Sequence, residues 1–126
     1  VMEIKWLSAK EKEGVASFYL TNIDLNMVAS VPFQYAYRVQ VGIDENNNVV
    51  IKPLQKERVL TGDIDEYTLY KICMNKSYSR ISSVDLMKNI SNILGIKLDK
   101  KVPVKFKTRW DESENVLIIY KDKECD

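Results

Sequence analysis

The chain has 126 residues, of which 45% are hydrophobic and 29% charged, with four glycines and three prolines. This size and composition predict one folded domain over residues 1–126 and exclude a disordered or fibrous protein. Nineteen Lys and Arg residues against 18 Asp and Glu leave a net charge of +1, so bulk charge indicates neither a nucleic-acid nor a membrane partner. The chain has no histidine, which excludes most familiar hydrolase chemistry and most zinc sites.

The two cysteines, Cys73 and Cys125, stand far apart and indicate neither a disulfide framework nor a Cys-x-x-Cys metal site. The first residues lack the apolar core of a secretion signal. The longest notable apolar run, residues 116–120, is far short of the roughly 18 residues that cross a bilayer. We therefore expect a cytoplasmic protein without a membrane anchor, a metal or another cofactor.

In the first half, the pattern predicts strands over residues 3–6 and 16–20. A short segment after residues 23–26 predicts one or two helical turns, because Pro32 is tolerated only in the first turn of a helix. Residues 56–66 are polar and rich in turn formers, which indicates a connector between two halves of the chain.

In the second half, residues 70–74 predict a strand and residues 78–81 a short extended segment. The clearest helix follows, between an N-cap at Ser82 or Ser83 and Gly95 at the C-cap position. Its apolar residues at helical spacing are Leu86, Met87, Ile90, Ile93 and Leu94.

Two similar segments predict β-hairpins. Residues 43–51 and 110–118 share Asp, Glu, Asn, Val and Ile at an offset of 67 positions (111 − 44), and each has a polar cluster between two β-prone stretches. Upstream of the second turn, apolar and basic residues alternate, which predicts one buried and one exposed strand face. The two sets are Val104, Phe106, Thr108 and Trp110 on the buried face and Lys105, Lys107 and Arg109 on the exposed face. Residues 37–43, which lie 67 positions earlier, alternate in the same way.

Together these elements predict an α+β fold in which strands dominate, with two quasi-repeated strand–helix–hairpin units over residues 16–55 and 67–121. The second unit has a strand, a helix, a Leu-Gly-Ile motif and an alternating hairpin. The residues are Arg80-Ile81, Leu94-Gly95-Ile96, Lys100-Lys101-Val102 and Leu117-Ile118-Ile119. Over about residues 78–121 this order resembles the AbrB/MraZ superfamily of swapped-hairpin DNA-binding proteins, and residues 22–53 look like a degenerate second copy.

The resemblance implies units that interleave their hairpins, within one chain or between chains, and a transcription regulator that is not an enzyme. It also implies a homo-oligomer that binds double-stranded DNA. In that family, basic residues around the first strand of the unit and its loop meet DNA, and the matching positions here are Lys76 and Arg80.

The residues themselves offer a second candidate for DNA contact. Six cations fall within residues 97–109, and Lys105, Lys107 and Arg109 alternate along a predicted strand. Side chains on one strand face repeat at about 6.6 to 6.8 Å, close to the phosphate spacing along one DNA strand, so backbone contact is possible. The alternative is that these cations keep a strand soluble and block aggregation.

Other motifs are weaker. The loop that starts at Asp44 begins like a calcium loop, but Val49 replaces the glycine at position six and Gln55 the glutamate at position twelve, so we expect no metal. Tyr120, opposite Lys105 in the simplest hairpin pairing, is the aromatic residue to test for base stacking. The main alternative function is a protein-interaction or structural domain without nucleic-acid binding; a small-ligand sensor has no identifiable pocket residues.

Overall fold

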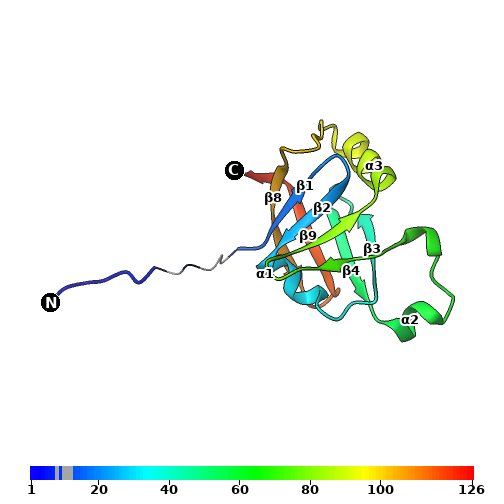
Figure 1. Ribbon diagram of the computed structural model, residues 1–126, viewed down its shortest axis with the longest axis horizontal. Coiled ribbons are helices and arrows are strands. Elements are labelled where there is room, and N and C mark those ends of the chain that lie inside the picture. Colours follow the sequence, from blue (N-terminus) through cyan, green and yellow to red (C-terminus); the bar gives the residue numbers. More distant parts are fainter. Residues whose placement is uncertain (8, 10–12) are drawn as a thin grey trace.

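The computed structural model of the chain describes residues 1–7, 9 and 13–126. Within this part, nine strands form one antiparallel sheet, accompanied by short helices. In chain order the elements are β1 (Val15–Phe18), β2 (Asn22–Asn26), α1 (Met27–Ser30), η1 (Val31–Phe33), β3 (Arg38–Ile43), β4 (Val49–Leu54), α2 (Lys56–Leu60), η2 (Glu66–Thr68), β5 (Leu69–Tyr70), β6 (Cys73–Met74), β7 (Tyr78–Ser82), α3 (Val84–Leu94), β8 (Val104–Asp111) and β9 (Val116–Cys125) (Figure 1).

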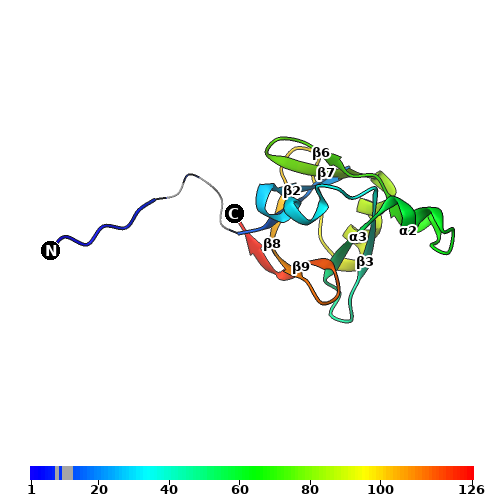
Figure 2. The same cartoon turned by 90° about the horizontal axis from the view of Figure 1, so that it is seen from below.

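The sheet curls into a half-barrel, with the strand order β5-β3-β4-β9-β8-β1-β2-β7-β6 (Figures 1 and 2). Its two edge strands, β5 and β6, are separated by only two residues of the chain. Tyr70 of β5 pairs with Val39 of β3, whereas Cys73 of β6 pairs with Arg80 of β7. Because three residue steps span at most about 11 Å, the two edges of the sheet must lie close together. One segment, residues 69–74, therefore forms both edge strands and pairs with backbone groups of β3 and β7 that would otherwise be unpaired.

The core fills the inside of the curled sheet and is closed by α1, η1 and α3. Alternate strand residues point inward, as the period of two requires. Phe18 and Phe106 pack with ring centroids 5.2 Å apart, and Phe33 meets Trp110 edge to face at 6.2 Å. Burying each of the three phenylalanine side chains contributes about 1.5 to 3 kcal/mol. The core is the main reason that these strands form one sheet.

Helix α3 forms where the sequence predicts it. The Ser83 hydroxyl accepts a hydrogen bond from the Leu86 N–H at 3.1 Å, and Gly95 takes the left-handed conformation at φ 64°. Leu86, Met87 and Ile90 are buried against the core. The prediction of a helix between a serine N-cap and Gly95 is confirmed, with Ser83 as the cap.

Both hairpins form at the predicted places, and each turn is built around an aspartate. The carboxylate of Asp44 accepts the N–H groups of Asn46 and Asn48 at 2.9 Å each. The carboxylate of Asp111 accepts the Ser113 hydroxyl at 2.7 Å and the Glu114 N–H at 3.1 Å. The predicted alternation along β8 is also confirmed, because Phe106 is buried while Lys107 and Arg109 are exposed. Local turn chemistry and alternation thus specify the hairpins.

The prediction of an α+β fold with two strand–helix–hairpin units, over residues 16–55 and 67–121, is wrong, although strands do dominate. The structure has one curled sheet with few short helices, and α1 has four residues where α3 has eleven. The asparagines with positive φ, Asn47 and Asn115, are 68 positions apart (115 − 47), so they do not follow the offset of 67. Similar turn chemistry therefore produced a local sequence match without a repeated helix-containing unit.

Three other elements differ from their predictions. Residues 3–6 alternate like a strand but join no sheet, because a strand needs a neighbour to pair its backbone groups. Residues 70–74 are divided between β5 and β6, which pair with opposite ends of the sheet. Residues 56–66 include the helix α2. Among the described residues, no helix is both long and apolar enough to cross a membrane.

Candidate functional site

The three cations of β8 lie together on the outer face of the sheet. Lys107 and Arg109 are exposed, and Lys105 is half-buried between its cross-strand neighbours, Ser17 of β1 and Cys125 of β9. Their common direction follows from the burial of Phe106 on the opposite face, which leaves the odd-numbered residues outside. This part of the predicted site is therefore assembled on one rigid strand.

Strand β9 adds two residues to this surface because it is irregular opposite β8. Phe106 pairs with Glu124 while Thr108 pairs with Ile119, so β9 has extra residues between the two pairs. The register of the hairpin, in which Thr108 pairs with Ile119, and this bulge together change the predicted pairing: Lys105 lies opposite Cys125 instead of Tyr120. The Tyr120 hydroxyl is brought 2.9 Å from Nε of Arg109, from which it accepts a hydrogen bond.

Lys123 is the residue of this surface that the sequence analysis missed. Its Nζ lies 4.7 Å from the centre of the Tyr120 ring, and both residues line a shallow groove of about 760 Å³ with Lys107 and Arg109. No alternation rule places Lys123 beside these residues, because the bulge interrupts the period of two along β9. We call Lys105, Lys107, Arg109 and Lys123 the basic strip.

Acidic side chains accompany the basic strip without neutralising it. Lys107 Nζ lies 3.7 Å from a carboxylate oxygen of Glu13, and Arg109 Nη2 lies 3.5 Å from one of Asp111. Both contacts are long and exposed, and such pairs contribute little. The hydrogen bond to Tyr120 is the largest cause that raises the pKa of Arg109 above its usual value, followed by the charge interactions with Tyr120 and then with Asp111. Arg109 therefore stays charged, and its guanidinium has Tyr120 and Asp111 as neighbours.

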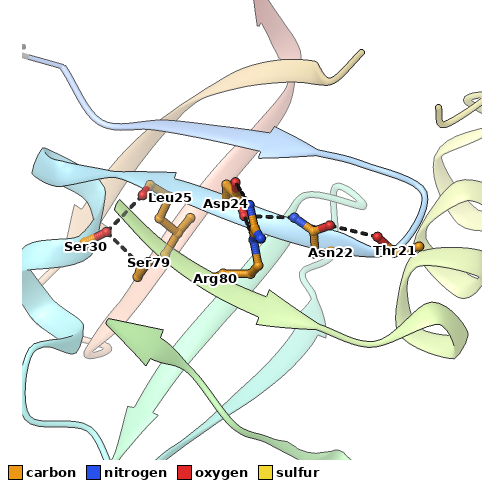
Figure 3. A network of polar contacts seen from close by, with 7 residues as sticks. All are labelled: Thr21, Asn22, Asp24, Leu25, Ser30, Ser79 and Arg80. Carbon is orange, nitrogen blue, oxygen red and sulfur yellow. Dashed lines mark hydrogen bonds and ion pairs between the residues drawn. The ribbon is translucent and has the colours of Figure 1, made fainter. Parts of the chain in front are cut away.

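Arg80 lies on the same outer face but is already engaged. Its Nε and Nη2 donate to the two carboxylate oxygens of Asp24 at 2.7 and 2.9 Å (Figure 3). Its guanidinium also lies 5.3 Å from the centre of the Tyr78 ring. The hydrogen bonds to Asp24 raise the pKa of Arg80 above its usual value. Strands β1 and β2 separate Arg80 from Lys105, which corresponds to about 14 Å across the sheet.

Lys76 lies apart from the basic strip, in the turn between β6 and β7. The turn is closed by the Asn75 N–H, which donates to the Tyr78 carbonyl at 2.8 Å. Lys76 lines a small groove with residues of α1. Of the five predicted contact residues, the structure thus brings together Lys105, Lys107 and Arg109 and separates Lys76 and Arg80 from them.

A buried pair of serines, one of them on the inner side of β7, is structural. The Ser30 hydroxyl donates to the Leu25 carbonyl at 3.0 Å and lies 2.7 Å from the Ser79 hydroxyl (Figure 3). These bonds satisfy both buried hydroxyls and attach α1 to β7, as buried polar groups require. The sequence contained no signal for this contact, because the two serines are 49 positions apart.

The described residues contain no group of three or more Cys, Asp or Glu side chains that could hold a metal ion. In the turn that resembles a calcium loop, burial by itself raises the pKa of Asp44, but hydrogen bonds from the N–H groups of Asn48 and Asn46 outweigh it and lower the pKa. The carboxylate is thus occupied in shaping the hairpin.

Comparisons with known proteins add nothing to this picture. The chain has no significant match among protein-family models, curated proteins or solved structures. The resemblance to the AbrB/MraZ superfamily stays a prediction, and the function must be argued from the residues of this chain.

Proposed function

We propose that this protein is a non-enzymatic DNA-binding regulator of the AbrB/MraZ type that holds the phosphates of double-stranded DNA on its basic strip. The observation that carries the proposal is the arrangement of Lys105, Lys107 and Arg109 on one outward strand face, extended by Lys123 from β9. Strand β8 spaces the side chains of Lys105, Lys107 and Arg109 about 6.6 to 6.8 Å apart, a repeat that suits successive phosphates.

The lysines and the arginine of the basic strip would contact phosphates in different ways. The lysines act as flexible point charges, whereas Arg109, oriented by Tyr120, offers its remaining N–H groups in a planar fork that suits two phosphate oxygens. Contacts of this kind position a protein on DNA without reading its sequence. Arg80 and Lys76 contact DNA only where the duplex passes over β7 and its turn, and Arg80 must then share its charge with Asp24.

The proposal places the protein in the cytoplasm. Cys73 and Cys125 are both free thiols, and Cys73 is exposed. Unpaired, accessible thiols suit a reducing compartment.

A second candidate is a protein-interaction domain without nucleic-acid binding. One observation favours it: Arg80, Lys107 and Arg109 each lie next to an acidic side chain, respectively Asp24, Glu13 and Asp111. A surface of alternating charge is suited to a protein surface of complementary charges.

A titration with random-sequence duplex DNA separates the two candidates. The test protein is the triple variant Lys105→Glu, Lys107→Glu and Arg109→Glu. The matched control is Lys97→Glu, Lys100→Glu and Lys101→Glu, which makes the same charge change at exposed positions outside the strip. We expect affinity that falls with salt, a slope of log affinity on log salt reduced by about 3 in the test variant, and a much smaller effect in the control. Equal losses in both variants, or no binding at low salt, would overturn the proposal.

A further inference from the structure

One end of the sheet exposes three apolar side chains. Leu20 lies in the turn between β1 and β2, Val84 is the first residue of α3, and Val102 lies in the loop between α3 and β8. Their exposed fractions are 45%, 58% and 68%. Figure 1 shows that the turn, the loop and α3 lie at the same end of the molecule. We call Leu20, Val84 and Val102 the apolar tip.

Backbone hydrogen bonds join the three chain segments of the apolar tip. The Leu20 N–H donates to the Asp99 carbonyl at 2.9 Å, and the Ser83 N–H donates to the Thr21 carbonyl at 3.1 Å. Strands β1 and β8 also pair directly, so the turn after β1 lies beside the residues that lead into β8. The three apolar side chains therefore belong to one surface.

The loop before β8 is fixed in a conformation that leaves Val102 exposed. Leu98 is buried in the core and attaches the loop to it. The Asp99 carboxylate accepts the N–H groups of Lys101 and Val102 at 2.7 Å each. The hydrogen bonds from Val102 and Lys101 lower the pKa of Asp99 below its usual value. The carboxylate is thus occupied in shaping the loop.

Three exposed lysines accompany the apolar tip, and none of them forms an ion pair among the described residues. They are Lys97, Lys100 and Lys101. Because Asp99 is the one acidic residue between them, residues 97–102 carry a net charge of +2. Asp85 and Lys88 of α3 add one charge of each sign. The surface therefore combines an apolar centre with unpaired positive charge.

This combination fits an anionic lipid bilayer better than a nucleic acid. A DNA backbone would attract the lysines but would leave the apolar tip in water. A bilayer offers anionic headgroups to the lysines and an apolar region below them to the exposed side chains. Lysine stems are long and flexible, so their ammonium groups can stay at headgroup level while the shorter apolar side chains enter the interface.

We infer that the apolar tip and its three lysines bind the surface of an anionic lipid bilayer, with Leu20, Val84 and Val102 inserted among the headgroups. The contact is peripheral, so it needs no membrane-spanning helix. It uses a surface outside the basic strip and goes beyond the proposed function.

Co-sedimentation with vesicles tests the inference. The vesicles contain phosphatidylcholine alone or phosphatidylcholine with phosphatidylserine. We expect binding to the vesicles with phosphatidylserine that weakens as salt is added. The triple variant Lys97→Glu, Lys100→Glu and Lys101→Glu should weaken it by at least about 100-fold, because each lysine near such a surface contributes about fivefold. The basic-strip triple variant, Lys105→Glu, Lys107→Glu and Arg109→Glu, makes the same charge change and should lose much less.

An uncharged double variant tests the apolar part of the contact. Leu20→Ser with Val102→Ser should weaken vesicle binding by about tenfold or more, because both side chains lose an apolar environment. The dependence on salt should stay the same, since the charge is unchanged. The matched control, Met27→Ser with Val31→Ser, alters two apolar side chains of α1 and η1 that are 47% and 56% exposed, and should bind like the unmodified chain.

All substituted residues outside β8 are exposed, and circular dichroism verifies that each variant folds. Three results would overturn the inference. The first is equal binding to vesicles with and without phosphatidylserine, or binding to neither. The second is a Leu20→Ser and Val102→Ser variant that binds like the unmodified chain. The third is an equal loss in the two lysine-to-glutamate triple variants.

Discussion

Asp24 and Arg80 form an ion pair with two hydrogen bonds across strands β2 and β7, although 56 positions separate them in the sequence. Asp24 also accepts a hydrogen bond from Nδ2 of Asn22 at 2.8 Å (Figure 3). The Asp24 side chain is 17% exposed and that of Arg80 43%, so the pair is partly shielded from water. Arg80 is therefore a structural cation first, and its availability to a ligand depends on Asp24.

Asp24→Asn removes one charge of the pair and keeps an oxygen that can accept the hydrogen bond from Asn22. We expect the free energy of unfolding to fall by about 1 kcal/mol, because the pair is only partly shielded from solvent. If Arg80 reaches DNA, its release should raise the affinity for a duplex at low salt. Urea unfolding and a duplex titration measure the two effects; a lower duplex affinity in a folded variant would contradict Arg80 as a contact.

Gly14→Ala is expected to destabilise the start of β1. A Cβ at this position would clash with Oγ1 of Thr108 and lie 3.3 Å from the Ala29 Cβ. Overpacking of this kind costs about 1 to 3 kcal/mol. Thr108→Ala removes the clashing atom, so the double variant should lose less stability than the sum of the single variants. Additive losses in urea unfolding would show that the close approach is relieved in another way.

Asn47 and Asn48 are neighbours in the first hairpin turn and should respond differently to substitution. Asn47 has φ 63°, so Asn47→Gly should change stability little, while Asn47→Val should cost about 1 to 2 kcal/mol. Asn48 is buried, and its Oδ1 accepts the Lys121 N–H at 3.2 Å. Asn48→Ala leaves that group without its partner and should cost about 1 to 3 kcal/mol. Thermal unfolding distinguishes these cases; a stable Asn48→Ala would contradict its role.

The same turn predicts a dependence of stability on pH. The pKa of Asp44 lies below its usual value of 3.8, because N–H groups of the turn outweigh the effect of burial. The fold thus favours the carboxylate, so its contribution is complete above the usual pKa and is lost as the pH falls through the lower folded-state value.

Asp44→Asn should therefore lose less stability than the unmodified chain between about pH 5 and pH 2. Asp122→Asn, which changes an exposed carboxylate of β9, serves as the control. Urea unfolding midpoints across this range give the comparison, and identical acid profiles for Asp44→Asn and the unmodified chain would refute the assignment.

Features with a local cause could be predicted from the sequence. Helix α3 follows from Ser83, Gly95 and helical spacing, all within a few turns of the chain. The faces of β8 follow from alternation, because a period of two admits only one arrangement that keeps Lys105 and Lys107 out of the core. Three cations of the candidate site could be placed together for this reason.

Features with a long-range cause could not be predicted. The curl of the sheet depends on β5 and β6 pairing with distant strands, and the alternation of residues 70–74 contains no sign of the bend between them. The contact between Asp24 and Arg80 depends on the sheet order, and the position of Lys123 over the Tyr120 ring depends on the β9 bulge. The prediction of repeated units was wrong because it relied on the similarity of two turns that each begin with an aspartate. Such turns recur in proteins of different architecture.

The central claim, that DNA phosphates lie on the basic strip, is tested most directly by amide chemical shifts of the nitrogen-labelled protein during titration with a short duplex at low salt. The account predicts shifts that cluster on residues 104–111 of β8 and 120–125 of β9 and reverse when salt is added. Shifts confined to residues 27–34 and 74–78 or to residues 97–101, or an unchanged spectrum at saturating duplex, would contradict it.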